Sequence, residues 1–223
     1  MLQPESFQFL KDLKQNNNRE WFISQAKCYE EYKKNYRQLG EAFIAEMSKV
    51  DESLSQLDFK DVSFRINRDI RFSKDKTPYK TNMAIWLSEG TKNTNLAGYY
   101  VHIEPGASFI AAGIHYPDAA DLRKIRREIK GFYEDLEEIV AEPQFKKIYG
   151  ALDSDENNTL KSAPKDFDKD HPAIQFLRLK SFTATAKLTD KEVQAKDFVK
   201  ATSEKLLVLQ PLVEFINRAL TTE

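Results

Sequence analysis

The sequence predicts an α+β fold in which a central, largely antiparallel sheet is flanked by N-terminal, middle and C-terminal helices. Apolar residues recur at three- and four-residue intervals up to about position 50 and again after about position 119, which is typical of amphipathic helices. Between about positions 62 and 115 the period falls to two, as in half-buried strands. These strands are joined by short connections, which favour antiparallel pairing.

The N-terminal part is predicted to be helical. A short helix opens at Pro4 and ends at the polar run 15–18, with apolar positions at Phe7, Leu10 and Leu13. One long helix, or two helices that meet near Gly40, should follow. The asparagines of the polar run can cap the start of this helix, because an Asn side chain accepts hydrogen bonds from unpaired backbone N–H groups.

Five strands and three further helices are expected after these. The strands are predicted over residues 64–72, 79–88, 99–104, 108–115 and 179–188, with a loop over 89–97. A helix is predicted from Ala119 to Glu142, a short one over 145–149, and a C-terminal one that includes Phe198 and Leu220. Residues 153–170 should be irregular. No repeat or linker divides the chain, so we expect one domain over residues 1–223.

Composition narrows the class of protein. The net charge is −1, which argues against a surface that binds nucleic acid as a whole. Cys28 is the only cysteine, so neither an intramolecular disulfide nor a cysteine-based zinc site can form. No apolar run approaches the roughly 20 residues of a membrane span, and the start lacks the pattern of a signal peptide. We therefore expect a cytoplasmic protein without a membrane partner. Its oligomeric state stays open.

Common cofactor and nucleophile motifs are absent from the sequence. It contains no phosphate-binding loop of the Walker type, no dinucleotide glycine fingerprint and no GxSxG elbow. The three histidines are not spaced as a helical metal pair, so no metal site is predicted, although magnesium held by carboxylates stays open. The cofactor is unknown.

The segment from position 65 to 80 concentrates positive charge. It carries six cations against two anions, a local net charge of +4, so the rest of the chain sums to −5. Such a segment requires a partner, which can be neighbouring carboxylates or an anionic ligand. The candidate ligand-binding residues are Arg65, Arg68, Asp69, Arg71, Lys74, Lys76, Tyr79, Lys80, Tyr100 and Lys180.

The parity of the predicted strands places many of these side chains on one polar sheet face. In the first strand the odd positions are polar, but Arg68 interrupts the apolar even positions, so it must be paired, extended toward water or displaced by a bulge. The next strand presents Lys80 and the third presents Tyr100, His102 and Glu104. His102 and Glu104 are the candidate catalytic pair, because imidazole and carboxylate can act as acid and base.

The segment Phe64–Thr81 resembles the signature of a bacterial family, domain of unknown function 2461. Other stretches resemble further blocks of that family: 17–22, 98–106, 164–172 and 179–182. The resemblance covers nearly the whole chain and implies one domain. It implies no reaction, since the family has no established activity.

Three functional hypotheses follow. In the first, the polar sheet face binds a small anionic, phosphorylated ligand, with enzymatic turnover left open. In the second, the cations and the rings of Tyr79, Trp86 and Tyr100 bind single-stranded nucleic acid. In the third, the protein is structural or mediates interactions, and the basic segment forms an internal ion-pair network.

Overall fold

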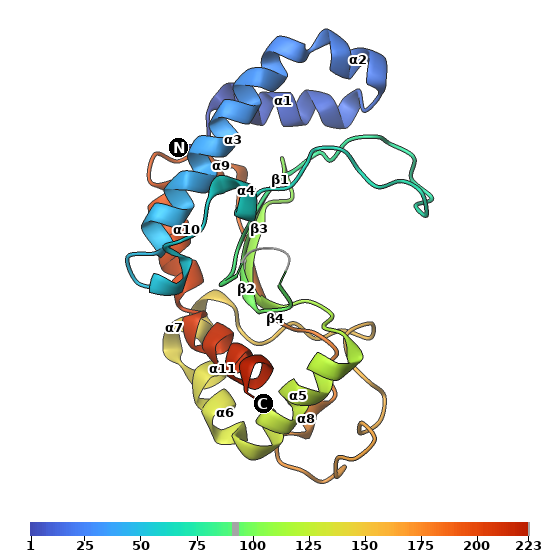
Figure 1. The fold of residues 1–223 in the computed structure, drawn as a ribbon, viewed down its shortest axis with the longest axis vertical. Coiled ribbons are helices and arrows are strands. Elements are labelled where there is room, and N and C mark those ends of the chain that lie inside the picture. The colour runs from blue at the N-terminus through green and yellow to red at the C-terminus, as the bar shows by residue number, and fades with distance from the viewer. Residues whose placement is uncertain (91–93, 223) are drawn as a thin grey trace. The chain divides into compact units, whose positions relative to one another are not determined.

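A computed structural model describes residues 1–90 and 94–222 (Figure 1). The predicted α+β class is confirmed: four antiparallel strands form one sheet in the order β1-β2-β3-β4. The predicted loop 89–97 includes residues 91–93, which lie outside the described residues. The strands are β1 Met83–Leu87, β2 Gly98–Ile103, β3 Phe109–Ile114 and β4 Phe182–Lys187. The helices are α1 Pro4–Gln15, α2 Arg19–Ser24, α3 Ala26–Met47, the 3-10 helix η1 Glu52–Leu54, α4 Phe59–Val62, α5 Ala119–Gly131, α6 Tyr133–Ala141, α7 Pro143–Ile148, α8 Ile174–Leu177, α9 Asp190–Val193, α10 Phe198–Leu207 and α11 Gln210–Thr221.

The chain divides into two compact units whose segments alternate along the sequence. The first unit comprises Met1–Leu87, Tyr100–Ile110 and Lys187–Glu204, and the second comprises Ser88–Tyr99, Ala111–Ala186 and Lys205–Glu223. The expectation of one domain over residues 1–223 stays a prediction. No helix in the described ranges is long and apolar enough to cross a membrane.

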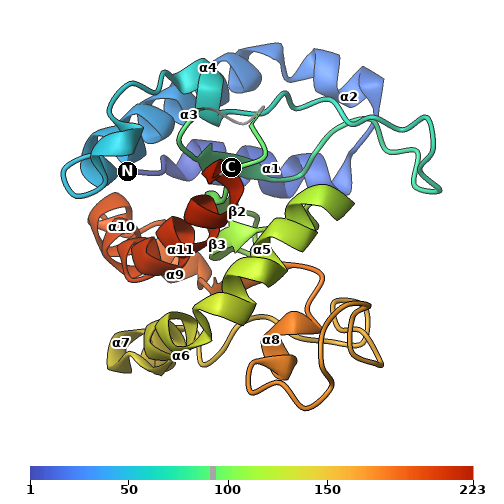
Figure 2. The ribbon, with the colours of Figure 1, turned by 60° about the horizontal axis from the view of Figure 1, so that its bottom comes forward.

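The first unit begins with helices α1, α2 and α3, of which α1 and α3 pack against each other (Figure 2). Asn18 caps α2, because its side chain accepts a hydrogen bond from the backbone N–H of Trp21 at 2.9 Å, as the polar run predicted. Of the two alternatives for this region, a break near Gly40 is wrong, since α3 runs through this residue, and the single long helix is instead interrupted at Gln25, between α2 and α3. A Cβ at position 40 would lie 2.6 Å from the Phe59 ring, so the glycine instead allows close packing against α4.

The first predicted strand, over residues 64–72, is wrong. This stretch and the residues up to 82 form a long loop that pairs with itself through one antiparallel bridge between Asn67 and Tyr79. The alternation of apolar residues does not correspond to a buried face, because Phe72 is 95% exposed and Phe64 is 37% exposed. We refer to residues 64–82 as the basic loop.

Local side-chain hydrogen bonds explain why the basic loop does not extend into a strand. The Asp69 carboxylate accepts from the backbone N–H of Arg71, and the Asp75 carboxylate accepts from the N–H of Thr77 at 2.9 Å. Bonds from an Asp side chain to the N–H two residues later turn the backbone and compete with a strand ladder. Pro78, which has no N–H, cannot complete a ladder either.

The remaining strands agree with the predicted parity. The second predicted strand is shorter than expected and begins at Met83, but Met83, Ile85 and Leu87 are fully buried, as the odd positions predicted. β2 and β3 lie within a residue or two of their predicted bounds. In the last strand, Leu179 forms only an isolated bridge with Thr159, so β4 begins three residues later than predicted.

Two helices that the sequence predicted as continuous are each divided in the structure. The single helix predicted over 119–142 is divided at Phe132 into α5 and α6, directly after Gly131, a residue with low helix propensity. The predicted C-terminal helix is likewise two helices, and α11 begins next to Pro211, which suits the first turn of a helix. Helix α11 packs against α5 (Figure 2). Residues 153–170 contain no helix or strand, as predicted.

Candidate functional site

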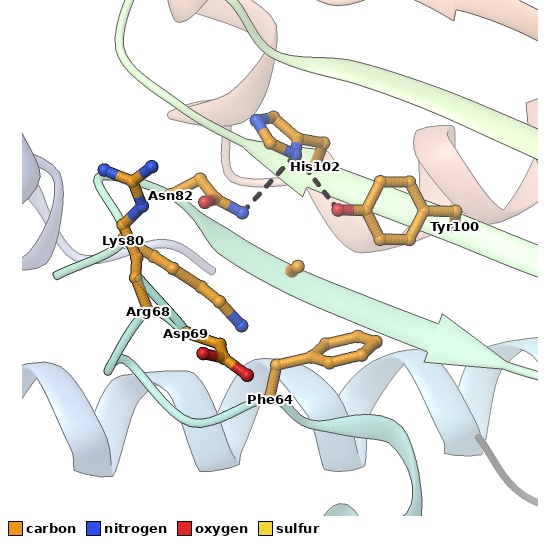
Figure 3. A pocket seen from close by; sticks show the side chains of 8 residues that line it. Phe64, Arg68, Asp69, Lys80, Asn82, Tyr100 and His102 are labelled. Atoms are coloured by element: carbon orange, nitrogen blue, oxygen red, sulfur yellow. Dashed lines mark hydrogen bonds between the residues drawn. The ribbon is translucent and has the colours of Figure 1, made fainter. Parts of the chain in front are cut away.

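The first unit contains a pocket of about 380 Å³ on the polar face of β1 and β2 (Figure 3). It is lined by even-numbered positions of β1 and of the residues just before β1, together with even-numbered positions of β2. The polar faces predicted for these two strands therefore lie side by side. Ala84 is also one of the lining residues, and its small side chain fills little of this space. The lining residues are Phe64, Arg68, Asp69, Lys80, Asn82, Ala84, Tyr100 and His102.

His102 connects the pocket to Glu104 through a chain of hydrogen bonds. Its Nδ1 lies 3.1 Å from the Tyr100 hydroxyl and 3.4 Å from Nδ2 of Asn82, and its Nε2 lies 3.2 Å from Oε2 of Glu104. A carboxylate only accepts, and an amide NH₂ only donates. The partners therefore assign the proton to Nε2, so that Nδ1 accepts from the Tyr100 hydroxyl. The imidazole also stacks on the Phe109 ring at 4.6 Å, which fixes its plane.

The Glu104 carboxylate is held from several sides. Its Oε1 accepts hydrogen bonds from the Lys14 ammonium at 2.9 Å and from the Thr81 hydroxyl at 3.1 Å. Burial alone would raise the pKa of Glu104, but the hydrogen bonds from Lys14, His102 and Thr81 outweigh it and lower the pKa. For Tyr100, burial raises the pKa of the phenol, so this side chain keeps its proton and can donate it.

Lys80 is the least compensated cation of the pocket. No carboxylate oxygen of the described chain lies within ion-pair distance of its ammonium, which instead lies 5.3 Å from the centre of the Phe64 ring. Partial burial, and then the positive charge of Arg65, lower the pKa of Lys80. Arg65 is itself exposed and forms no ion pair within the described ranges. Asp69 also lines the pocket, but its carboxylate is paired with Arg71, and neither Lys80 nor Arg65 has a carboxylate within ion-pair distance in the described chain.

Arg68, which interrupts the apolar positions of the first predicted strand, is paired with a carboxylate. Its guanidinium binds the Asp75 carboxylate, the hydroxyl of Thr77 and, at 3.1 Å, the carbonyl oxygen of Thr77. The backbone N–H of Thr77 and the Arg68 guanidinium lower the pKa of Asp75. Arg68 therefore closes the basic loop on itself, while part of its side chain lines the pocket.

The other predicted ligand-binding residues lie outside the pocket or at its edge. Arg71 is exposed and forms an ion pair of 2.6 Å with Asp69, whose pKa this hydrogen bonding lowers. Lys76 donates to the carbonyl oxygen of Ile70, and Lys74 is exposed. Tyr79 is buried and stacks on Phe22 at 3.9 Å, and Lys180 belongs to the second unit.

Two residues that position the site were missed by the sequence analysis. The side chain of Asn17 binds the backbone of Tyr79 twice, at 2.8 Å to the oxygen and 3.1 Å to the N–H, and so fixes the residue before Lys80. The hydroxyl of Tyr36 donates to the carbonyl oxygen of Ala84 and accepts from the N–H of Phe64. Both contacts join positions far apart in sequence, and no local pattern signals them.

Replacing Tyr36 by Phe is expected to lower the free energy of unfolding by about 1–3 kcal/mol, because two backbone groups lose their partner. Urea unfolding measures the effect. Tyr116→Phe is the matched control: this residue is 48% exposed and its hydroxyl forms no hydrogen bond in the described chain, so its change should stay within about 0.5 kcal/mol. Equal values for the two variants would contradict the role of Tyr36.

No group of three or more His, Cys, Asp or Glu side chains in the described ranges is arranged to hold a metal ion.

The comparisons with known proteins then identify the family. The family described as "Conserved hypothetical protein (DUF2461)" matches residues 5–215 of the 223. The chain belongs to this family. No curated protein and no solved structure matches the chain. Membership in the DUF2461 family confirms the predicted resemblance, and the chemistry of the pocket is therefore argued from its own residues.

Proposed function

We propose that the pocket of the first unit binds a small anionic, phosphorylated ligand. The observation that carries this proposal is the Lys80 ammonium, which lines a pocket, is partly withdrawn from water and has no carboxylate partner in the described chain. Removing a charge from water costs free energy unless an opposite charge compensates it. A bound anion supplies this compensation, and it also relieves the repulsion between Lys80 and Arg65.

The neighbouring groups suit the polar atoms of such a ligand. The Asn82 amide and the Tyr100 hydroxyl line the same pocket, and the Phe64 ring offers an apolar wall (Figure 3). Phosphate oxygens accept hydrogen bonds from amide, hydroxyl and ammonium donors alike. The alternative of an internal ion-pair network accounts for Arg68 and Arg71, which have carboxylate partners, and leaves Lys80 unexplained. We place this binding in the cytoplasm, because the one cysteine cannot form an intramolecular disulfide.

A thermal-shift screen at low salt with inorganic phosphate, sugar phosphates, nucleotides and short oligonucleotides tests the proposal. A ligand present at 100 times its dissociation constant stabilises the folded state by about 2.7 kcal/mol, which corresponds to roughly 5–10 °C for a chain of this size. Lys80→Met should remove this shift, because it removes the uncompensated charge and keeps the length of the side chain. Without ligand, Lys80→Met should melt at the same temperature as the wild type or higher.

Two further variants test whether the thermal shift comes from binding in the pocket. Ala84→Leu should remove the shift by filling the pocket without a change in charge. Lys27→Met changes the same charge on the exposed surface of α3 and should keep the full shift. Stabilisation by oligonucleotides alone, with a steep dependence on salt, would favour the nucleic-acid hypothesis instead. A shift that persists in both Lys80→Met and Ala84→Leu would overturn the pocket as the binding site.

A further inference from the structure

The surroundings of the Lys80 amine favour its neutral form more than a fully exposed position would. Partial burial and then the positive charge of Arg65 lower its pKa, and no carboxylate of the described chain lies within ion-pair distance, although the Phe64 ring at 5.3 Å favours the ammonium form. A lysine that is desolvated or placed beside another cation is the usual form of an amine nucleophile in proteins.

A proton donor lies in the same pocket. The Tyr100 hydroxyl lines this pocket, and its hydrogen bond to Nδ1 of His102 fixes the position of its oxygen (Figure 3). Glu104 keeps the proton of His102 on Nε2, and Lys14 and Thr81 keep Glu104 in place. A nucleophilic amine and an oriented acid in one pocket are the two groups that carbonyl chemistry requires.

We propose that Lys80 forms an imine with a phosphorylated aldehyde or ketone, with Tyr100 as the catalytic acid and His102 as its positioning residue. The inference rests on the proposed anion site, where the Asn82 amide and the charge of Arg65 would hold the phosphate while the carbonyl carbon meets the deprotonated Lys80 amine. It adds the class of ligand, a carbonyl compound, and the class of reaction.

The reaction balances without any oxidant or reductant. The lone pair of Nζ forms a bond to the carbonyl carbon, the π electron pair moves to the oxygen, and this oxygen takes the proton of Tyr100. Tyr100 recovers a proton from the nitrogen and thereby completes a carbinolamine. It then protonates the new hydroxyl group, which leaves as water while the C=N bond forms, and it finally recovers this proton from the iminium nitrogen. Free amine and carbonyl compound thus become imine and one water molecule.

Pyridoxal 5′-phosphate, an aldehyde that carries a phosphate, is a suitable probe. The full chain is exposed to it briefly at low concentration, reduced with borohydride to fix any imine, and digested for peptide mass spectrometry. Lys80 should be labelled at least about tenfold more than Lys74 and Lys76, because a bound phosphate raises the effective concentration of the aldehyde near Lys80. These two lysines are matched controls, since both are exposed on the same loop.

Three comparisons separate the contributions of the phosphate, the Tyr100 hydroxyl and the space in the pocket to the labelling of Lys80. Inorganic phosphate should protect Lys80 and leave Lys74 labelled, and pyridoxal without phosphate should lose the preference for Lys80. Tyr100→Phe should slow the labelling of Lys80 severalfold more than it weakens the phosphate-dependent rise in melting temperature, a difference that a role in binding or structure alone would not give. Ala84→Leu should lose the Lys80 label, and the protection experiment on the wild type stands independently if this variant fails to fold.

The outcomes distinguish the two proposals. Labelling spread over exposed lysines, together with a phosphate-dependent thermal shift, would overturn the imine and leave the anion site standing. Preferential labelling of Lys80 by both aldehydes, without protection by phosphate, would overturn the phosphate site and leave a reactive amine.

Discussion

Replacing Gly113 by Ala is expected to lower the free energy of unfolding by roughly 2–5 kcal/mol. Gly113 in β3 has φ +122°, a backbone conformation that residues with a side chain rarely adopt. An added Cβ would also lie 2.0 Å from the carbonyl oxygen of Phe182 in β4. A backbone oxygen cannot move aside without a displacement of its strand, so the substitution should open the pairing of β3 with β4.

Gly106→Ala is the matched control for this prediction. Its φ is +78°, but a Cβ there would have no heavy atom within 4 Å, so it should cost only about 1 kcal/mol of conformational strain. Thermal and urea unfolding of both variants measure the difference. If the two variants were equally stable, the close approach of β3 and β4 at Gly113 would be incorrect.

Replacing Glu104 by Gln is expected to lower the free energy of unfolding by about 1–3 kcal/mol at neutral pH. The Glu104 carboxylate accepts hydrogen bonds from Lys14, Thr81 and His102. The neutral amide of Gln has a similar volume, but it forms weaker hydrogen bonds with the nitrogen donors of Lys14 and His102. Lys14→Met is a useful comparison, because it removes only one of these bonds from a side chain that is 51% exposed. It should therefore cost less than Glu104→Gln.

The effect of Glu104 should depend on pH with a defined sign. Its pKa in the folded protein is lowered, so the unfolded chain takes up its proton first as the solution becomes acid. The stabilisation is fully present above the pKa of an unfolded Glu, about 4.3, and is lost as the pH falls through the lower folded value. The difference in stability between the wild type and Glu104→Gln should therefore shrink below about pH 4. A difference that stays constant down to pH 2 would contradict the ionised network.

Some of the candidate site could be predicted from the sequence. Alternation placed Lys80, Tyr100 and His102 on polar strand faces, and all three line the pocket, Tyr100 and His102 from β2 and Lys80 from the basic loop before β1. This succeeds because a residue in a strand points to the same side as the residue two positions away, whatever the rest of the fold does. The same rule failed at residues 64–72, where alternation is equally clear. There the Asp69 and Asp75 side chains bind the backbone N–H groups two residues later, and the pairing of this stretch in the described chain is limited to the bridge between Asn67 and Tyr79.

The sequence by itself determined the α+β class, the polar faces of β1 and β2, the concentration of positive charge in the basic loop and the family. These follow from periodicity, composition and local motifs, which are properties of neighbouring residues. Only the tertiary structure decided that Arg68 and Arg71 have carboxylate partners while Lys80 has none in the described chain, and that Tyr36, Asn17 and Lys14 position the site. The physical reason is that pairing and desolvation depend on contacts between distant parts of the chain, and these contacts exist only after folding.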